Sequence, residues 1–227
     1  AAWWGDRCDK LALVPASVSA PSAYGGGSHT PNVSSWGGNI LRGDDGKYHL
    51  WVSEFAEGCG LTAWLNNSMI SHAVAATPMG PFTKRDTSLG IFAHNVVPVR
   101  APASFGTGER PYYLFHIGNG NSSGTGNGAG PPTYPWGPRS VINCSARPTT
   151  LQRQNPTDNS DDGRLEAPPS ALGNLAHRSA TPNGPWEPIP SMYPPCNNPS
   201  PLWHPNGTLF LGCNPTQSAI PLFSSHD

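Results

Sequence analysis

The chain contains 227 residues, of which only 12% are charged, and its net charge at neutral pH is −1. This near-neutral balance argues against partners held by charge, such as nucleic acids or anionic membrane surfaces. No apolar run approaches the roughly 20 residues that a membrane helix needs, so we expect no membrane span. Its 26 glycines and 27 prolines predict many turns, and eight tryptophans can supply a packed core.

The first part of the chain carries no regular pattern, and we expect an irregular N-terminal segment over residues 1–35. Its opening letters, AAWWGDRCDK, read as a mature or trimmed end rather than a targeting segment. NILRGDDGKYHLWVSEF then predicts two strands joined by an Asp-Gly turn over residues 43–46. SMISHAVAA predicts a third strand, TPMGPF a turn, and the residues after it a short outer strand.

The same order of strands and turns returns further along the chain. HNVVPVRAPASFGTGERPYYLFHIGN predicts two more strands, and LGNLAHRSA takes the place of MISHAVAA. TPNGPWEPI then repeats the T-P-x-G-P-[F/W] turn of TPMGPFTKR, and NNPSPLWHPNGTLFLGCN opens a third unit. Tandem units of four short strands are typical of β-propeller blades. We therefore predict an all-β fold of propeller-type blades, each a four-stranded antiparallel sheet.

The predicted units run over residues 36–91, over residues 94–192 and from residue 196 onward, which gives two and a half to three blades in a partial propeller domain over 36–227. The excess length of the second unit, residues 119–171, is rich in Gly, Asn, Pro and Ser and predicts an exposed loop insertion. A closed propeller needs at least four blades. Open sheet edges would invite self-association; the alternative is a piece of a longer protein.

Sequons and cysteines predict a secreted protein. Five N-x-[S/T] sequons predict N-linked glycans, at Asn32, Asn66, Asn121, Asn143 and Asn206. The five cysteines form no C-x-x-C pair, which leaves a zinc ribbon unsupported and favours disulfides in an oxidising compartment. We expect Cys196 to pair with Cys213, because both flank one predicted hairpin. The odd number leaves one thiol free or bonded to another chain.

Several segments together resemble a known family. SEFAEGCGLTAWLNNSMISHAVAATPMGPF, FAHNVVPV, YYLFHIGNG and CNNPSPLWHPNGTLF are similar to glycoside hydrolase family 43-like proteins, the five-bladed β-propellers of the arabinanase, levansucrase and invertase group. The resemblance covers residues 36–118 and 172–215 and implies a carbohydrate-binding funnel at the propeller axis. In hydrolytic relatives, two Asp and one Glu stand near the starts of successive inner strands. Glycoside hydrolysis requires such facing carboxyls.

The chain departs from this pattern at the corresponding positions, which the sequence places at Asn39, Asn95 and Asn198. No acidic residue lies within three residues of any of them. An amide can hydrogen-bond a sugar hydroxyl, but it cannot serve as a proton donor or base near neutral pH. We therefore interpret the three amides as substrate-binding candidates and expect the catalytic function to be degenerate.

Four other side chains are candidates for the same funnel. Trp36, beside a blade-opening strand, is a candidate sugar-stacking platform or an inter-blade packing residue. His94 and His116 are substrate-binding candidates whose alternative role is structural. Glu54 is the remaining catalytic candidate, and its alternative role is a hydrogen-bonded strand-end residue that fixes the loop around Cys59.

The eight histidines show no metal-ligand spacing, and the acidic runs over residues 44–46 and 158–163 read as a turn and a solvated loop, so we expect neither metal nor cofactor. Two hypotheses of function remain. The first is a secreted glycoprotein, a degenerate glycosidase relative that binds carbohydrate or builds an extracellular assembly. The second is an active family 43-type hydrolase, acting on arabinan- or fructan-type substrates, whose acidic residues come from segments absent here.

Overall fold

The computed structural model describes residues 3–4, 10–11, 24, 33–103, 108–118, 120, 144, 176–189, 197–214 and 222–225. Within these ranges the prediction of an all-β fold is confirmed, because helical residues are confined to two 3-10 turns, η1 (Ala56–Gly58) and η2 (Leu61–Ala63), and one α-turn, α1 (Trp64–Asn67). The strands are β1 (Trp3–Trp4), β2 (Lys10–Leu11), β3 (Ser35–Arg42), β4 (Tyr48–Phe55), β5 (Ser68–Ala75), β6 (Thr83–Leu89), β7 (Ala93–Arg100), β8 (Tyr112–Gly118), β9 (Ala176–Ser179), β10 (Glu187–Ile189), β11 (Asn197–Trp203), β12 (Leu209–Asn214) and β13 (Leu222–Ser225).

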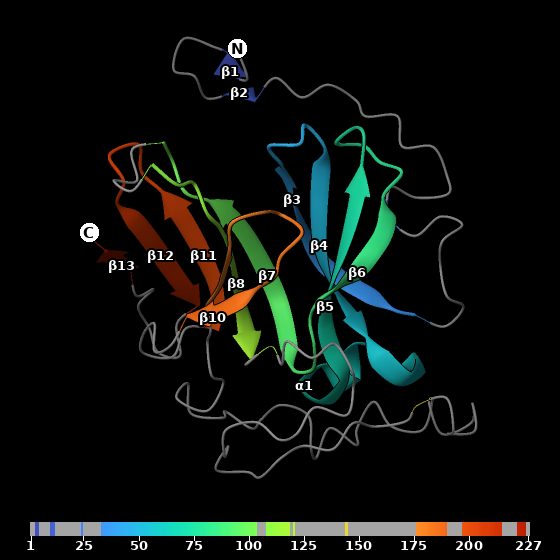
Figure 1. Ribbon diagram of the computed structural model, residues 1–227. Coiled ribbons are helices and arrows are strands. Elements are labelled where there is room, and N and C mark those ends of the chain that lie inside the picture. Colours follow the sequence, from blue (N-terminus) through green and yellow to red (C-terminus); the bar gives the residue numbers. More distant parts are fainter. Residues whose placement is uncertain are drawn as a thin grey trace.

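Three antiparallel sheets stand side by side (Figure 1). Sheet 1 has the order β3-β4-β5-β6, sheet 2 the order β7-β8-β9-β10, and sheet 3 the order β11-β12-β13. In each sheet the chain runs from the first strand outward through its neighbours, which confirms the predicted blade-like units. The segment expected to be irregular also contains a short hairpin, in which β1 pairs with β2.

The two T-P-x-G-P corners, which mark the repeat in the sequence, have the same geometry. In sheet 1 the Thr77 hydroxyl donates to the Gly80 carbonyl at 2.8 Å. In sheet 2 the Thr181 hydroxyl donates to the Gly184 carbonyl, also at 2.8 Å. Both glycines have positive φ, 84° and 81°, which a residue with a Cβ rarely adopts. The repeat seen in the sequence is therefore also a repeat of the structure.

A second corner, between the first two strands, is shared by sheets 1 and 3. Gly43 N donates to Lys47 O at 2.8 Å, and His204 N donates to Thr208 O at 2.8 Å. In both turns a short polar side chain accepts a backbone N–H two residues ahead: Asp45 Oδ1 from Lys47, and Asn206 Oδ1 from Thr208. Such side-chain-to-backbone bonds are what favour Asp-Gly and Asn-Gly in turns.

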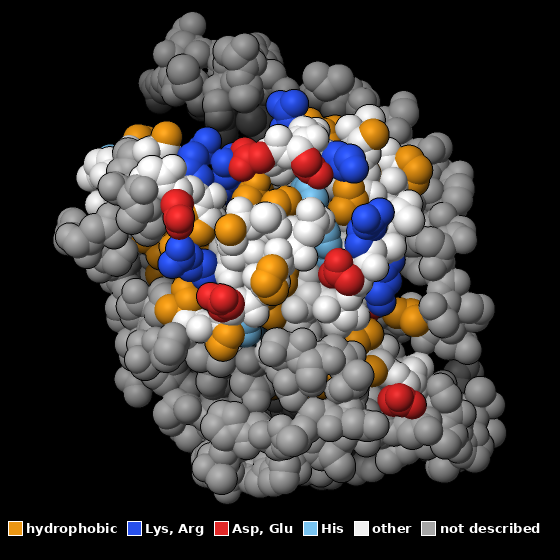
Figure 2. Space-filling view, viewed as in Figure 1, with side chains coloured by type: hydrophobic (Ala, Val, Ile, Leu, Met, Phe, Trp, Pro, Cys, Tyr) orange, Lys and Arg blue, Asp and Glu red, His pale blue; other side chains and the backbone are white. Residues whose placement is uncertain are grey.

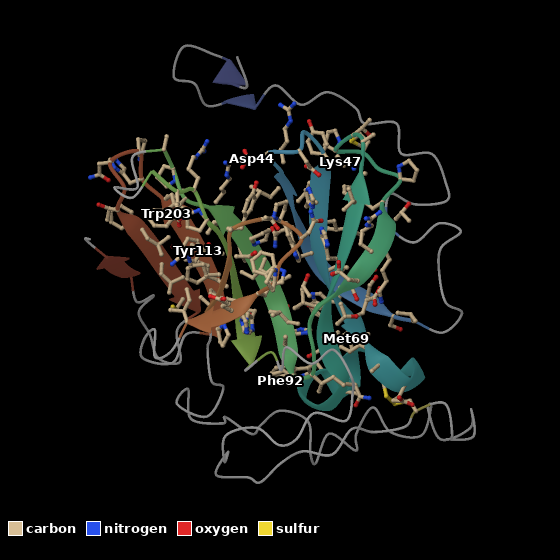
Figure 3. The ribbon with its side chains drawn as sticks, in the orientation of Figure 1. Asp44, Lys47, Met69, Phe92, Tyr113 and Trp203 are labelled. Atoms are coloured by element: carbon tan, nitrogen blue, oxygen red, sulfur yellow. A yellow bond between two sulfur atoms is a disulfide. The ribbon has the colours of Figure 1, made fainter. Side chains whose placement is uncertain are left out.

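The core lies between the sheets. Trp51 of β4 is fully buried and meets Trp186 edge to face, with ring centroids 5.9 Å apart, between sheets 1 and 2. Tyr113 of β8 and Trp203 of β11 meet between sheets 2 and 3, with centroids 6.1 Å apart (Figure 3). Aromatic pairs of this kind add to the stabilisation from area burial alone.

The face of sheet 1 that turns away from sheet 2 is also covered. Its apolar side chains, Leu50, Val52, Ala73 and Ala75, are at most 7% exposed, and Tyr24 packs against them. A second copy of the chain would therefore have to displace part of the same chain to pack on this face. The predicted self-association through open sheet edges concerns other surfaces of the sheets and remains a prediction.

Basic and acidic side chains are interspersed on the face seen in Figure 2 rather than gathered by sign. No helix in the described part of the chain is long and apolar enough to cross a membrane.

Candidate functional site

The first strand of each sheet contains a β-bulge near its start. The bulge falls between Trp36 and Gly38 in β3, between His94 and Val97 in β7, and between Asn197 and Ser200 in β11. The bulged residue has positive φ in all three: Gly37 at 54°, Asn95 at 51° and Asn198 at 50°. Gly and Asn are the residues that tolerate this conformation best, and a bulge re-aims the side chain it carries.

These bulges correct one sequence alignment. The sequence placed Asn39 opposite Asn95 and Asn198, whereas register and backbone conformation place Gly37 there. The error arises because a bulge inserts a residue that the letter pattern does not mark. Asn39 still reaches the neighbouring sheet, since its Nδ2 donates to Val96 O at 2.8 Å.

Asn95 and Asn198 lie together, as expected of residues at one axis. Asn95 Nδ2 donates to Asn198 Oδ1 at 2.5 Å, across sheets 2 and 3. The Asn95 backbone N donates to Ser53 Oγ at 3.1 Å, which ties the bulge to sheet 1. Neither Asn95 Oδ1 nor Asn198 Nδ2 has a hydrogen-bond partner among the described residues, so this amide pair offers an acceptor oxygen and a donor NH₂ group to a ligand.

Trp36 stands beside the amide pair, one residue before the first bulge. It is 44% exposed, and its ring meets that of His94 edge to face at 6.1 Å. His94 is itself buried against Phe55 and Trp64. Burial lowers the pKa of His94 to about 4, so its imidazole is neutral at ordinary pH. Its buried Nδ1 has no hydrogen-bond partner in the described structure.

His116 lies deeper, within sheet 2, and is fully buried. Its Nε2 is 2.9 Å from His177 Nδ1, and its Nδ1 is 3.1 Å from Ile117 O. Burial, and then the charge of His177, lower the pKa of His116 to about 3. Its bonded neighbours are a histidine of the same sheet and a backbone carbonyl, so nothing in these contacts links it to the amide pair.

Glu54, the catalytic candidate from the sequence, is buried at the end of β4 with three donors around its carboxylate. Ser71 Oγ donates to Oε2 at 2.6 Å, Lys84 Nζ lies 2.5 Å from the same oxygen, and the Tyr24 hydroxyl donates to Oε1. Burial alone would raise the pKa of Glu54, but the bonds from Lys84, Ser71 and Tyr24 lower it overall. A carboxylate held ionised in this way is a poor proton donor, and its partners lie outside the Cys59 loop.

The remaining described carboxylates lie away from the amide pair, with one exception. Asp44 and Asp45 occupy the β3–β4 turn, Asp86 lies on β6, Glu109 precedes β8, and Glu187 lies on β10. The exception is Glu57, which is exposed in η1, just after β4, at the end of sheet 1 where β3 begins. Glu57 was not among the residues predicted from the sequence, although its place after a predicted strand end could have signalled it. One carboxyl alone does not make the pair that glycoside hydrolysis uses.

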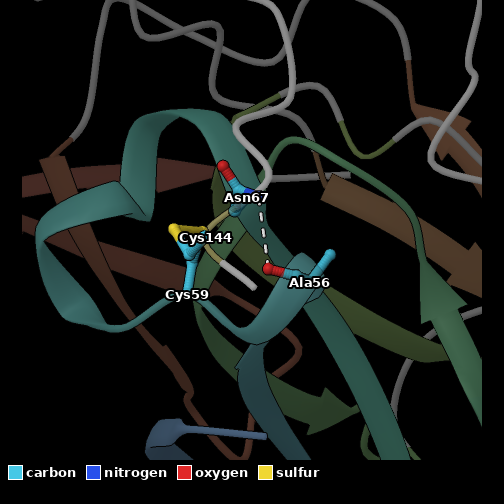
Figure 4. Close-up of a disulfide and its surroundings, with 4 residues drawn as sticks. All are labelled: Ala56, Cys59, Asn67 and Cys144. Carbon is cyan, nitrogen blue, oxygen red and sulfur yellow. Dashed lines mark hydrogen bonds between the residues drawn. A yellow bond between two sulfur atoms is a disulfide. The ribbon is translucent and has the colours of Figure 1, made fainter. Parts of the chain in front are cut away.

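A disulfide stabilises this end of sheet 1. Cys59 pairs with Cys144, 85 residues further along the chain, and nearby Asn67 Nδ2 donates to Ala56 O at 3.2 Å (Figure 4). This pairing could not be predicted, because cysteine spacing alone does not determine disulfide connectivity. Cys213 is also disulfide-bonded. Its predicted partner Cys196 lies outside the described residues, so that pairing stays a prediction.

Of the predicted glycosylation sites, Asn206 is exposed in the β11–β12 turn. Asn66 lies in α1. The other three, Asn32, Asn121 and Asn143, lie outside the described residues, as does most of the predicted insertion over 119–171 and the acidic run at 158–163. In the described part of the chain, no three His, Cys, Asp or Glu residues gather as a metal ion would require.

No protein-family model matches the chain, and no curated protein matches it. Among solved structures, the chain is similar to a family GH43 β-xylosidase/α-arabinofuranosidase from a compost microbial metagenome, solved with xylotriose in a calcium-free form. The two are 11% identical, with a TM-score of 0.41, over 79% of this chain and 42% of that one. The chain thus spans less than half the length of that structure.

Proposed function

We propose that this chain is a secreted, N-glycosylated protein that binds neutral carbohydrate at the ends of its inner strands and has lost the acids of a glycosidase. The observation that carries the proposal is the amide pair of Asn95 and Asn198 beside the exposed ring of Trp36. Amides that offer one donor and one acceptor match the hydroxyls of a sugar, and an indole face matches its C–H face.

The uncharged character of the site supports this function over hydrolysis. The three bulge positions hold Gly37, Asn95 and Asn198, where the resemblance to family 43 implies two Asp and one Glu. The adjacent imidazole of His94 is neutral, because burial lowers its pKa. The described residues thus offer hydrogen bonds without a general acid and base.

The alternative is an active family 43-type hydrolase, acting on arabinan- or fructan-type substrates, whose carboxyls come from outside the described residues. Glu57 is the described carboxyl that could contribute, because it is exposed and follows β4 at the end of sheet 1 where β3 begins.

Calorimetric titration with arabino- and fructo-oligosaccharides, run alongside an assay for released reducing sugar, separates the two. Binding without release supports the proposal. Release that Glu57→Gln abolishes would establish the hydrolase instead, and Glu187→Gln, on an outer strand, is the matched control.

An Asn206 glycan is compatible with the turn and with this site. The Asn206 Oδ1 already accepts the Thr208 backbone N–H, whereas a glycan is attached through Nδ2. Asn206 also follows the end of β11 opposite to the one that carries Asn198. Peptide mass mapping before and after enzymatic deglycosylation tests occupancy at Asn206, and an unmodified Asn206 in protein from a secretory host would contradict it.

A further inference from the structure

Two buried histidines of sheet 1 and two carboxylates form a continuous row of side-chain contacts. His49 Nδ1 and His72 Nε2 are 2.8 Å apart. His49 Nε2 is 3.1 Å from Asp45 Oδ1, and His72 Nδ1 is 3.4 Å from Asp86 Oδ2. Both imidazoles are 0% exposed, whereas the Asp45 and Asp86 side chains are 37% and 47% exposed. This row of side chains thus crosses three strands of the sheet, with a solvent-accessible carboxylate at each end.

The fold holds this row of side chains in place from several sides. His49 and Trp51 share one face of β4, and Trp51 pairs in register with His72 on β5, so the three rings stack. A Cβ on Gly43 would lie 2.7 Å from both His49 Nε2 and Asp45 Oδ1, so the absence of a side chain there lets these two atoms meet. The arrangement is built into the turn and the strand register.

The two histidines have fewer ring N–H protons than the row of four side chains has contacts. Each neutral imidazole carries one N–H, so two neutral histidines supply two protons. The row has three contacts, and both of its ends are carboxylate oxygens that accept only. With two protons, one contact must place two lone pairs against each other, either nitrogen against nitrogen between the rings or nitrogen against oxygen at one end. A third proton would give every contact a donor and an acceptor.

The distances indicate which contact lacks its proton. Burial lowers the pKa of His49, which favours a neutral ring there. The two shorter contacts are both hydrogen bonds if His49 Nε2–H donates to Asp45 and His72 Nε2–H donates to His49. The bare nitrogen is then His72 Nδ1, which faces Asp86 across the longest contact of the row. That length exceeds the roughly 2.7–3.2 Å of an ordinary N–H···O bond.

We propose that the contact between His72 and Asp86 is a proton-uptake site, which takes one proton from solvent in acid and thereby fastens β6 to β5. The proton leaves a hydronium ion of the solvent and bonds to His72 Nδ1, no bond of the protein breaks, and the resulting imidazolium donates to the Asp86 carboxylate. Hydrogen bonds between charged partners are about twice as strong as neutral ones. The pairing of β6 with β5 in sheet 1 therefore becomes stronger in acid.

The surrounding charges are compatible with one added proton. Asp45 on the turn and Asp86 on β6 favour it, while Lys47, on the same turn as Asp45, opposes a positive charge on His49. From sheet 2, Tyr112 and Arg100 face the turn: the Tyr112 hydroxyl donates to Asp44 at 3.2 Å, and the cationic Arg100 pairs with the same carboxylate. Burial raises the pKa of Tyr112, so that hydroxyl stays neutral. The group facing the stacked rings from sheet 2 is the uncharged Trp186.

The variant Asp86→Asn gives a sharp test, because an amide at position 86 can donate to the bare His72 Nδ1 and complete the row without an added proton. Two-bond ¹H–¹⁵N spectra of the full chain, recorded between about pH 8 and pH 5, report the protonation of each ring nitrogen. We expect His72 Nδ1 to become protonated over this range in the natural sequence and to stay unprotonated in Asp86→Asn. Glu187→Gln, which removes one charge from the outer strand of sheet 2, should titrate like the natural sequence.

Unfolding in denaturant provides a second readout. Relative to the natural sequence, Asp86→Asn should lose stability at about pH 5 compared with pH 8, with a linkage of about one proton. Either of two results would overturn the proposal: His72 Nδ1 that stays unprotonated down to pH 5 in the natural sequence, or the same proton uptake in Asp86→Asn.

Discussion

The buried carboxylate of Glu54 and the amide pair of Asn95 and Asn198 are polar sites with opposite roles. Glu54 accepts from three donors and is 2% exposed. The amide pair makes one mutual hydrogen bond near the surface and leaves a donor and an acceptor without described partners. A group whose bonds are all made within the chain stabilises the fold, whereas a group with unused bonds can hold a ligand.

The contrast between these two sites shows where the charged side chains of this molecule lie. Asp44 pairs with Arg100 and Glu54 with Lys84, so these carboxylates connect strands and sheets. The ends of the inner strands carry glycine and amides instead. Substitutions in the two regions should therefore separate stability from binding.

Replacing the buried acid should cause the largest loss of stability. Glu54→Ala removes the shared acceptor of Lys84, Ser71 and Tyr24, and we expect the free energy of unfolding to fall by about 3 kcal/mol. Exposed Glu187→Ala should stay within about 0.5 kcal/mol. Denaturant unfolding measures both. A loss of carbohydrate binding at unchanged stability in Glu54→Ala would assign Glu54 to the binding site and erase the contrast.

Acid should destabilise the fold through its buried neutral histidines. Burial lowers the pKa of His94 and of His177 to about 4, and that of His116 to about 3, from an ordinary value of 6.5. The unfolded chain therefore binds more protons below pH 6.5, so the stability contributed by these neutral rings is present above that pH and is lost as the pH falls. The loss is at most about 1.4 kcal/mol per pH unit for each histidine.

Unfolding curves between pH 7 and about pH 4.5 measure this slope, to which the His72–Asp86 contact contributes with the opposite sign. His94→Gln should reduce the slope by the share of one histidine. A slope that does not change in His94→Gln would contradict the neutral state assigned to this ring beside the amide pair.

Removing one amide should weaken binding much more than folding. Asn95→Gly keeps the positive φ of the bulge and the backbone bond to Ser53, so we expect a stability cost below about 1 kcal/mol. Loss of the amide should weaken sugar binding about tenfold, the equivalent of one hydrogen bond. Asn198→Gly should behave alike. Calorimetric titration tests both, and equal affinities in the variants and the natural sequence would place the ligand elsewhere.

The smallest effect is expected at the bulge of β3, which lacks an amide. A Cβ at Gly37 would lie 3.8 Å from Asn95 Oδ1, and asparagine tolerates the φ of 54°. Gly37→Asn should therefore fold with a stability change below about 1 kcal/mol and alter affinity only several-fold. A large loss of stability would show that position 37 is not equivalent to positions 95 and 198.

The sequence revealed the repeat because its turns are chemically explicit. Pro and Gly at fixed places in T-P-x-G-P, and Asp-Gly and Asn-Gly between strands, each force one backbone geometry, so the corners and the sheets between them could be predicted. The bulges could not be predicted, because the extra residue with positive φ has no fixed letter: it is Gly at position 37 and Asn at positions 95 and 198. The placement of Asn39 failed for this reason.

Long-range partners were also beyond the reach of the sequence. Tyr24, Ser71 and Lys84 converge on Glu54 from three separate segments, and Cys59 meets Cys144 across 85 residues. Such contacts depend on how the strands pack, which neither periodicity nor spacing reports. The amides of Asn95 and Asn198 could be singled out beforehand only through the resemblance to family 43, which points to the starts of successive inner strands.

The most direct test of the amide site is the side-chain NH₂ signals of Asn95 and Asn198, followed by NMR while a neutral arabino- or fructo-oligosaccharide is added. The proposed function predicts that both signals shift with saturation and that the oligosaccharide remains intact over the titration. Signals that stay unmoved at saturating sugar, or cleavage of the oligosaccharide in the tube, would contradict it.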